Sequence, residues 1–149
     1  MFLEVGWSTS AQAGCFIAVP SGVLPRKPIV LIVDDNPMVR SLLTRTMELE
    51  RYHVYAAADG VEALTLLDKL PPVELVIADV SMPRMDGREL AIEMSKQHPH
   101  IPLLLISGVY LGGVAGLPGP VLPKPFTAMA LVSRVREVLG QGQHNGISV

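Results

Sequence analysis

From residue 28 onward, short apolar runs alternate with segments in which apolar residues recur at helical spacing. Runs that are apolar on both faces are typical of strands in a parallel sheet with helices on both sides. Three runs have this character: PIVLIV (28–33), ELVIA (74–78) and PLLLI (102–106). Two weaker strand candidates lie at 52–56 and 121–122. The pattern therefore predicts five strands with helices between them.

Capping residues mark where the helices should begin. Asn36, ahead of a proline, predicts the start of the first helix, and Asp59 with Glu62 has the spacing of a capping box for the second. Gly87 opens the third and Thr127 caps the fourth. The apolar stripes that these helices should bury are Val39, Leu42, Leu43 and Met47; Ala63, Leu64 and Leu67; Leu90, Ala91 and Met94; and Leu131, Val135, Val138 and Leu139.

The connection before the last strand has an unusual composition. Its twelve residues, GVYLGGVAGLPG (108–119), include five glycines, one proline and no charged residue. Glycine destabilises a helix by about 1 kcal/mol and proline by about 3 kcal/mol, so we expect a loop or one short turn there. Strand and helix alternate elsewhere, which predicts an α/β fold with an open, doubly wound parallel sheet.

The composition fits one compact domain. Of the 149 residues, 49% are hydrophobic and 17% are charged, which suits a buried sheet. The net charge is -2 without a Lys/Arg cluster, so we expect no nucleic acid as a direct partner. The single cysteine, Cys15, excludes an internal disulfide, and no apolar run approaches the ~20 residues of a membrane span. We therefore expect a cytoplasmic protein that does not contact a membrane.

The alternating pattern also sets the expected domain boundaries. Residues 27–140 carry the pattern and should form the domain. Residues 1–26 are expected to be an N-terminal extension or linker, and they lack the basic start and unbroken apolar stretch of a signal peptide. Residues 141–149 are expected to be a polar tail.

Polar side chains follow the predicted strands at one edge of the sheet, where doubly wound folds bind their ligands. In chain order they are Asp34, Asp35, Asp79, Ser107 and Lys124. Three carboxylates in one cleft repel one another unless a cation neutralises them. Oxygen ligands without His or Cys favour Mg²⁺ over zinc. The sequence therefore predicts a magnesium site at this edge.

Four segments together resemble the receiver domain of two-component response regulators, over residues 27–140: IVLIVDDN (29–36), LVIADVSMPRMDG (75–87), LLLISG (103–108) and LPKPF (122–126). The resemblance implies a flavodoxin-like, five-stranded sheet of order 2-1-3-4-5, here with the fourth helix shortened or replaced by the glycine-rich loop. It also implies a signalling switch of a two-component or phosphorelay system rather than an enzyme. Its partner would be a histidine kinase or a histidine phosphotransfer protein.

The resemblance assigns roles around the metal. Asp79 would be the phosphoacceptor, Asp35 a direct Mg²⁺ ligand and Asp34 a ligand largely through water. The backbone carbonyl of Ser81 would complete the protein's share of the coordination. Asp79 would then attack phosphorus while the cation neutralises the phosphoryl oxygens.

The resemblance also assigns the phosphoryl contacts and the switch. Ser107 and Lys124 would contact the phosphoryl oxygens, and the Lys124–Pro125 bond is expected to be cis. Ser107 would pull the following loop inward on phosphorylation. Many receivers move an aromatic residue three positions before the lysine, but that position is Val121 here. We therefore consider Tyr110 as the moving aromatic residue.

Two other functions and one further resemblance stay open. A pseudo-receiver that only binds proteins would be expected to lack a site residue, and none is missing. A Mg²⁺-dependent aspartyl-phosphate hydrolase would place an acid/base Asp two residues after the nucleophile, where this chain has Ser81. Residues 14–20, GCFIAVP, resemble the closing strand of a histidine-kinase ATP-binding domain, and a disordered extension or a mispredicted start fits them equally well.

Overall fold

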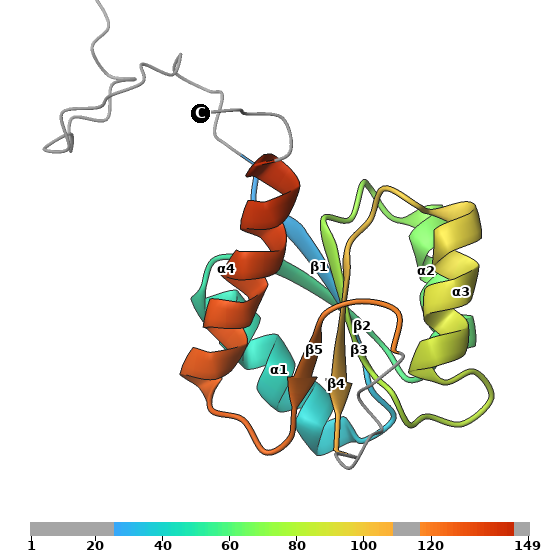
Figure 1. Ribbon diagram of the computed structural model, residues 1–149, viewed down its shortest axis with the longest axis horizontal. Helices are drawn as coiled ribbons and strands as arrows, with labels where there is room; N and C mark the ends of the chain where they lie inside the picture. Colours follow the sequence, from blue (N-terminus) through green and yellow to red (C-terminus); the bar gives the residue numbers. More distant parts are fainter. Residues whose placement is uncertain (1–25, 109–116, 145–149) are drawn as a thin grey trace, which may run out of the picture.

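The protein folds as a three-layer α/β domain, described by a computed structural model over residues 26–108 and 117–144 (Figure 1). All strand pairs are parallel and their order is β2-β1-β3-β4-β5, which confirms the predicted doubly wound, flavodoxin-like sheet. The strands are β1 (Ile29–Val33), β2 (His53–Ala57), β3 (Leu75–Asp79), β4 (Leu103–Ser107) and β5 (Val121–Pro123). The helices are α1 (Pro37–Leu49), α2 (Gly60–Lys69), α3 (Gly87–Gln97) and α4 (Ala128–His144).

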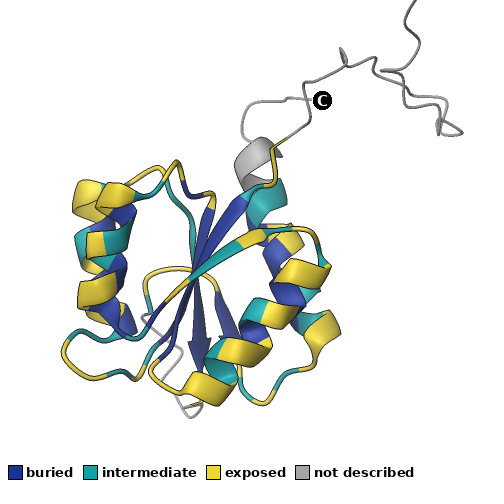
Figure 2. Cartoon of the chain, turned by 180° about the vertical axis from the view of Figure 1, so that it is seen from behind, coloured by how far each residue is buried: buried dark blue, intermediate teal, exposed yellow. Residues whose placement is uncertain are grey.

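The helices cover both faces of the sheet. α2 and α3 pack on one face and α1 and α4 on the other, and each pair buries its own apolar cluster against the strands (Figure 1). Every residue of β1 and β3 is buried, as the continuous apolar runs predict. Figure 2 shows the resulting pattern, with buried residues along the sheet and exposed residues on the outer sides of the helices.

The helix starts follow the predicted caps, with one difference. Asn36 accepts hydrogen bonds from the backbone of the first turn of α1, and Asp59 accepts one from Glu62 N in α2. The Glu62 carboxylate reaches past the N-cap and accepts from Ala58 N at 2.6 Å. The complete capping box lies at α3 instead, between Asp86 and Glu89.

One residue of the predicted buried stripe of α1 is exposed. Leu43 and Met47 face the sheet with at most 1% exposure, whereas Leu42 is 58% exposed. Successive helical residues are rotated by about 100°, so a stripe that follows the i, i+4 spacing leaves Leu42 at its side. Thr46 takes the remaining buried position, and its hydroxyl donates to Leu42 O at 2.9 Å.

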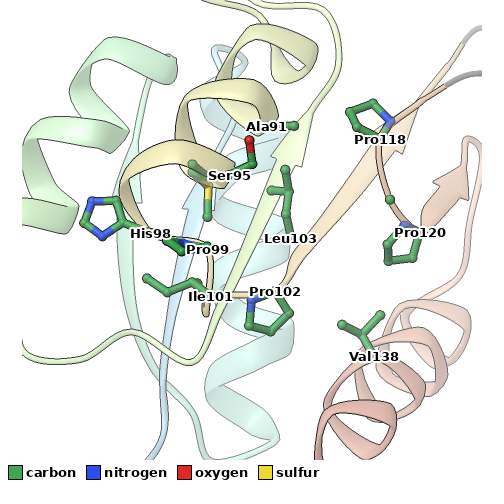
Figure 3. Close-up of a pocket in the computed structure, with 12 residues that line it drawn as sticks. Ala91, Ser95, His98, Pro99, Ile101, Pro102, Leu103, Pro118, Pro120 and Val138 are labelled. Atoms are coloured by element: carbon green, nitrogen blue, oxygen red, sulfur yellow. The ribbon is translucent and has the colours of Figure 1, made fainter.

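The connection from β4 to β5 differs from the other crossovers. Its described residues, 108 and 117–120, contain no helix, while 109–116, including Tyr110, lie outside the described part of the chain. A groove of about 580 Å³ opens near the amino ends of these two strands. Figure 3 shows it between Ser95 of α3, with His98 just after this helix, and the prolines 118 and 120, with Leu103 between them.

β5 is the short edge strand of the sheet. Pro120 O and Lys124 N form hydrogen bonds toward β4, so the intervening Val121 and Pro123 direct their backbone polar groups to the open side. Arg134 of α4 donates to Val121 O at 2.8 Å. The edge is therefore partly covered by a side chain of the last helix.

The last helix is longer than the sequence pattern suggests. Thr127 caps it, with the hydroxyl oxygen 3.0 Å from Ala130 N, and the helix continues past Gly140 to His144. Among the described residues, no helix is both long enough and apolar enough to cross a membrane.

Candidate functional site

The predicted site residues meet at the carboxyl edge of the sheet. Asp34 directly follows β1, Asp79 ends β3, Ser107 ends β4, and Lys124 directly follows β5. The register aligns these ends, because Val33 pairs with Ala78 and Asp79 with Ile106. Side chains that are far apart in the sequence therefore converge at the edge where the fold class places ligands.

Three carboxylates form a compact acidic cluster. One carboxylate oxygen of each of Asp34, Asp35 and Asp79 lies within 4.8 Å of the other two. Asp34 is fully buried and Asp79 is 7% exposed, whereas Asp35 is open to solvent. Asp34 Oδ1 accepts from Asn36 N at 2.8 Å, but its buried Oδ2 has no hydrogen-bond partner among the described residues. A buried anionic oxygen without a partner, beside two further carboxylates, fits a hard cation such as Mg²⁺.

The electrostatics of the cluster point the same way. Burial raises the pKa of Asp34 and the nearby charge of Asp79 adds to this, against the opposing hydrogen bond from Asn36. Burial also raises the pKa of Asp79, and Lys124 opposes that shift. Lys124 Nζ lies 3.5 Å from Asp79 Oδ1. One ammonium group leaves the cluster with excess negative charge, which a divalent cation would neutralise.

The two serines occupy different environments. Ser107 is buried, at 2% exposure, and its carbonyl accepts from Lys124 N at 2.8 Å, which ties the ends of β4 and β5 together. Ser81 is exposed on the loop after β3, and its backbone N–H donates to the Asp79 carboxylate. The Lys124–Pro125 bond is cis, as expected.

Glycine allows the loop after β3 to fold tightly beside the site. Gly87 N donates to Val80 O at 2.9 Å, and a Cβ at position 87 would lie 2.6 Å from Asp79 O. At the start of α2, Gly60 N donates to Met85 O of the same loop at 3.2 Å, and a Cβ at position 60 would lie 2.7 Å from Met85 Cγ. Both contacts need a residue without a side chain.

Two arginines that the sequence reasoning missed hold the loops of the site. Arg40 Nη1 donates to Asp34 O at 2.7 Å, across the start of α1. Arg84 forms an ion pair with Asp59, in which Nε lies 2.8 Å from Oδ2. No sequence spacing signals the second contact, because its partners lie on two different loops.

Comparison with known proteins places this geometry in a family. The model of the response regulator receiver domain matches residues 30–111, more than half of the chain. Curated relatives include the sensor kinase CckA of Brucella abortus, 40% identical over 116 residues, and the response regulator MprA of Mycobacterium sp. (strain KMS), 37% identical over 115 residues. Each match covers 74% of this chain, but 12% of CckA and 50% of MprA. The chain thus spans at most half the length of these relatives.

Solved structures agree with this match. The chemotaxis protein CheY4 of Vibrio cholerae is 31% identical with a TM-score of 0.67, over 76% of this chain and 100% of that one. The response regulator TrrA of Thermotoga maritima, solved in complex with Mg²⁺ and BeF, is 28% identical with a TM-score of 0.69, over 75% and 99%. The chain belongs to the response regulator receiver domain family, as its sequence motifs indicate.

Proposed function

We propose that this chain is a phosphoacceptor module that takes a phosphoryl group on Asp79 in the presence of Mg²⁺. The observation that supports it best is the acidic cluster, in which a buried Asp34 oxygen beside the Asp79 carboxylate has no hydrogen-bond partner in the described part of the chain. Receiver domains are signalling switches rather than enzymes acting on free substrates, so the consequence of the chemistry would be a change of conformation.

The metal ligands would be the carboxylates of Asp34, Asp35 and Asp79 together with the Ser81 carbonyl. The cation would supply charge neutralisation at the phosphoryl oxygens. Burial and carboxylate repulsion make the free cluster unfavourable, so binding would stabilise the folded state.

The chain's own residues would perform the transfer. A carboxylate oxygen of Asp79 attacks phosphorus as the bond from phosphorus to the donor imidazole nitrogen breaks, and the leaving nitrogen keeps that electron pair. Lys124, already 3.5 Å from Asp79, neutralises developing charge on the phosphoryl oxygens. The Ser107 hydroxyl would donate to one of these oxygens and so distinguish the phosphorylated state.

The start of α1 offers a contact surface for the donor. Met38 is 80% exposed and Leu42 is 58% exposed, and α1 begins directly after the acidic cluster. Exposed apolar side chains next to a reactive site are typical of a protein-binding surface. We therefore propose that a histidine kinase or a histidine phosphotransfer protein docks there in the cytoplasm. We further propose that residues 27–140 bind neither nucleic acid nor a membrane.

We propose that the route from phosphorylation to output differs from that of many receivers. Val121 is 8% exposed and has no ring that could move. The proposed role of Tyr110 and the kinase-like segment 14–20 both fall outside the described residues. We propose that the readout starts at Ser107.

A phosphorylation experiment tests the proposal. Purified protein incubated with Mg²⁺ and acetyl phosphate is expected to gain the mass of one phosphoryl group, mapped to Asp79 by peptide analysis. Asp79→Asn and a sample with EDTA should gain nothing, since one lacks the nucleophile and the other the cation. Wild-type protein that stays unmodified would favour a protein-binding pseudo-receiver, and steady turnover of free phosphate esters would favour the hydrolase.

A further inference from the structure

An ion pair between the buried Asp59 and the largely exposed Arg84 joins the start of α2 to the loop after β3. Asp59 is 3% exposed, and its Oδ2 accepts from Arg84 through Nε, at 2.8 Å, and through Nη2. Its other oxygen accepts from Glu62 N at 2.9 Å, so the same carboxylate also caps α2. One side chain thus fixes both the helix and the loop.

Asp59 is more buried than a helix cap requires. Asn36, which caps α1, is exposed, and Asp86, which caps α3, is only half-buried. Burial opposes ionisation of Asp59, but the hydrogen bonds from Glu62 and Arg84 more than offset it and lower its pKa. A buried, charged cap bonded to a distant arginine indicates a role beyond capping.

Arg84 adopts an unusual backbone conformation to make this contact. Its φ is 65°, in the left-handed region that residues other than glycine rarely adopt. The next residue is held as well, because Gly60 N donates to Met85 O at 3.2 Å. The first turn of α2 therefore holds the middle of the loop at two neighbouring residues.

We propose that Asp59 and Arg84 are a positioning pair that holds loop 80–86 in the conformation in which Ser81 binds the cation, an inference that rests on the proposed function. Ser81 itself is exposed, and the loop is otherwise closed at its ends, by the hydrogen bonds from Ser81 N to Asp79 and from Gly87 N to Val80 O. The contacts of Arg84 and Met85 with the start of α2 fix the middle of the loop. Neither residue would touch the phosphoryl group.

Magnesium titration of the full chain tests the pair. Arg84→Ala and Asp59→Asn are each expected to weaken Mg²⁺ binding about tenfold, the lower end of the range for residues that support metal ligands. The Mg²⁺ affinity of the double variant should be no lower than that of the single variant that binds less tightly, because each change breaks the same contact. Asn remains a good N-cap, so Asp59→Asn removes the pair while keeping the cap of α2.

The signs of the changes separate positioning from simple charge effects. If only the electrostatic field mattered, loss of the Arg84 cation would strengthen Mg²⁺ binding and loss of the Asp59 anion would weaken it. Positioning predicts weaker binding in both. Arg84→Lys keeps the charge but loses the two-nitrogen contact, so it should resemble Arg84→Ala more than the wild type.

A matched control lies on the other face of the protein. Arg136 of α4 and Glu50, which follows α1, form an Arg–carboxylate pair of 3.0 Å. Arg136→Ala should leave Mg²⁺ affinity within about twofold of the wild type, as expected for an exposed pair away from the site. Equal weakening by Arg136→Ala and Arg84→Ala would overturn the proposal.

Hydrogen exchange in EDTA measures the loop without the metal. The Gly60 and Gly87 amides should exchange about tenfold faster in Arg84→Ala and Asp59→Asn, and stay unchanged in Arg136→Ala. Wild-type exchange rates or wild-type Mg²⁺ affinity in these variants would overturn the positioning role. A wild-type chain that binds no Mg²⁺ would instead overturn the proposed function, so the two failures can be told apart.

Discussion

Two pairs of neighbouring strands differ in how they are connected: β1 and β3, here called the covered half, and β4 and β5, here called the open half. β1 and β3 are buried at every residue, with α1 and α4 on one face and α2 and α3 on the other. β4 and β5 are joined by a connection without a helix in its described residues, β5 is only three residues long, and a groove opens at the amino ends of the two strands. The three carboxylates lie on or next to the covered half, whereas Ser107 and Lys124 belong to the open half.

This difference suggests that the two halves have different roles in the site. Metal ligands need fixed positions, and helices on both sides of β1 and β3 provide them. Groups that respond to a new phosphoryl group need room to move, and a connection without a helix in its described residues would provide that room. Four measurements test whether the two halves have these roles, in order of decreasing effect.

Lys124→Ala removes the cation that the open half contributes to the site. Its ammonium lies 3.5 Å from Asp79 Oδ1, so its loss should slow phosphoryl uptake from acetyl phosphate by about 10²–10³-fold, as for other charge-stabilising donors. Rapid-quench kinetics at saturating Mg²⁺ would measure the rate. An unchanged rate would mean that the covered half alone carries the chemistry.

Equivalent truncations in the two halves should differ in cost. Leu31 of β1 is fully buried, so Leu31→Ala should lower the free energy of unfolding by about 4 kcal/mol, because no neighbour can fill the cavity. Leu122 lies on the edge strand at 7% exposure, where relaxation should limit the cost of Leu122→Ala to about 2 kcal/mol. Urea denaturation would give the free energy of unfolding of both variants, provided that their m-values equal that of the wild type. Equal losses would contradict the difference in packing.

Gly87→Ala should strain the loop beside the phosphoacceptor. The added Cβ would lie 2.6 Å from Asp79 O and 2.9 Å from Val80 Cα, and neither backbone atom can rotate away. We expect the variant to lose about 2 kcal/mol of stability in thermal unfolding. Gly140→Ala is the control, because a Cβ there meets nothing within 4 Å and alanine should stabilise the helix by about 0.5–1 kcal/mol.

The acidic cluster should make metal-free stability depend on pH. The raised pKa values of Asp34 and Asp79 mean that the folded state binds their protons more tightly than the unfolded chain. Stability should therefore fall as the pH rises from about 3.9, the unfolded value, through the raised folded values. In EDTA at neutral pH, Asp34→Asn should raise the free energy of unfolding by about 1 kcal/mol. This gain should shrink in acid, where the wild-type carboxyl is protonated. With Mg²⁺ present the wild type should be the more stable protein, because the metal stabilises only the wild type.

The sequence predicted the central strands and the site because both depend on local patterns. Apolar runs that end in a polar residue place Asp34, Asp79 and Ser107 at the carboxyl edge without any knowledge of packing. The pairing of Arg84 with Asp59 depends on how two loops pack, and the local cues at Asp59 indicated only a cap. Gly140 stays helical because apolar contacts earlier in α4, from Leu131 to Val138, outweigh its low propensity.

The hydrogen-bonding pattern of β5 has a consequence for self-association. Pro123 has no N–H to offer on the open side, and the Val121 carbonyl is already occupied by the Arg134 guanidinium. Of the four main-chain groups that Val121 and Pro123 could offer on this side, a second chain would therefore find two taken or missing. Pairing of a second copy along this edge should therefore be weaker than along a strand with every main-chain group free.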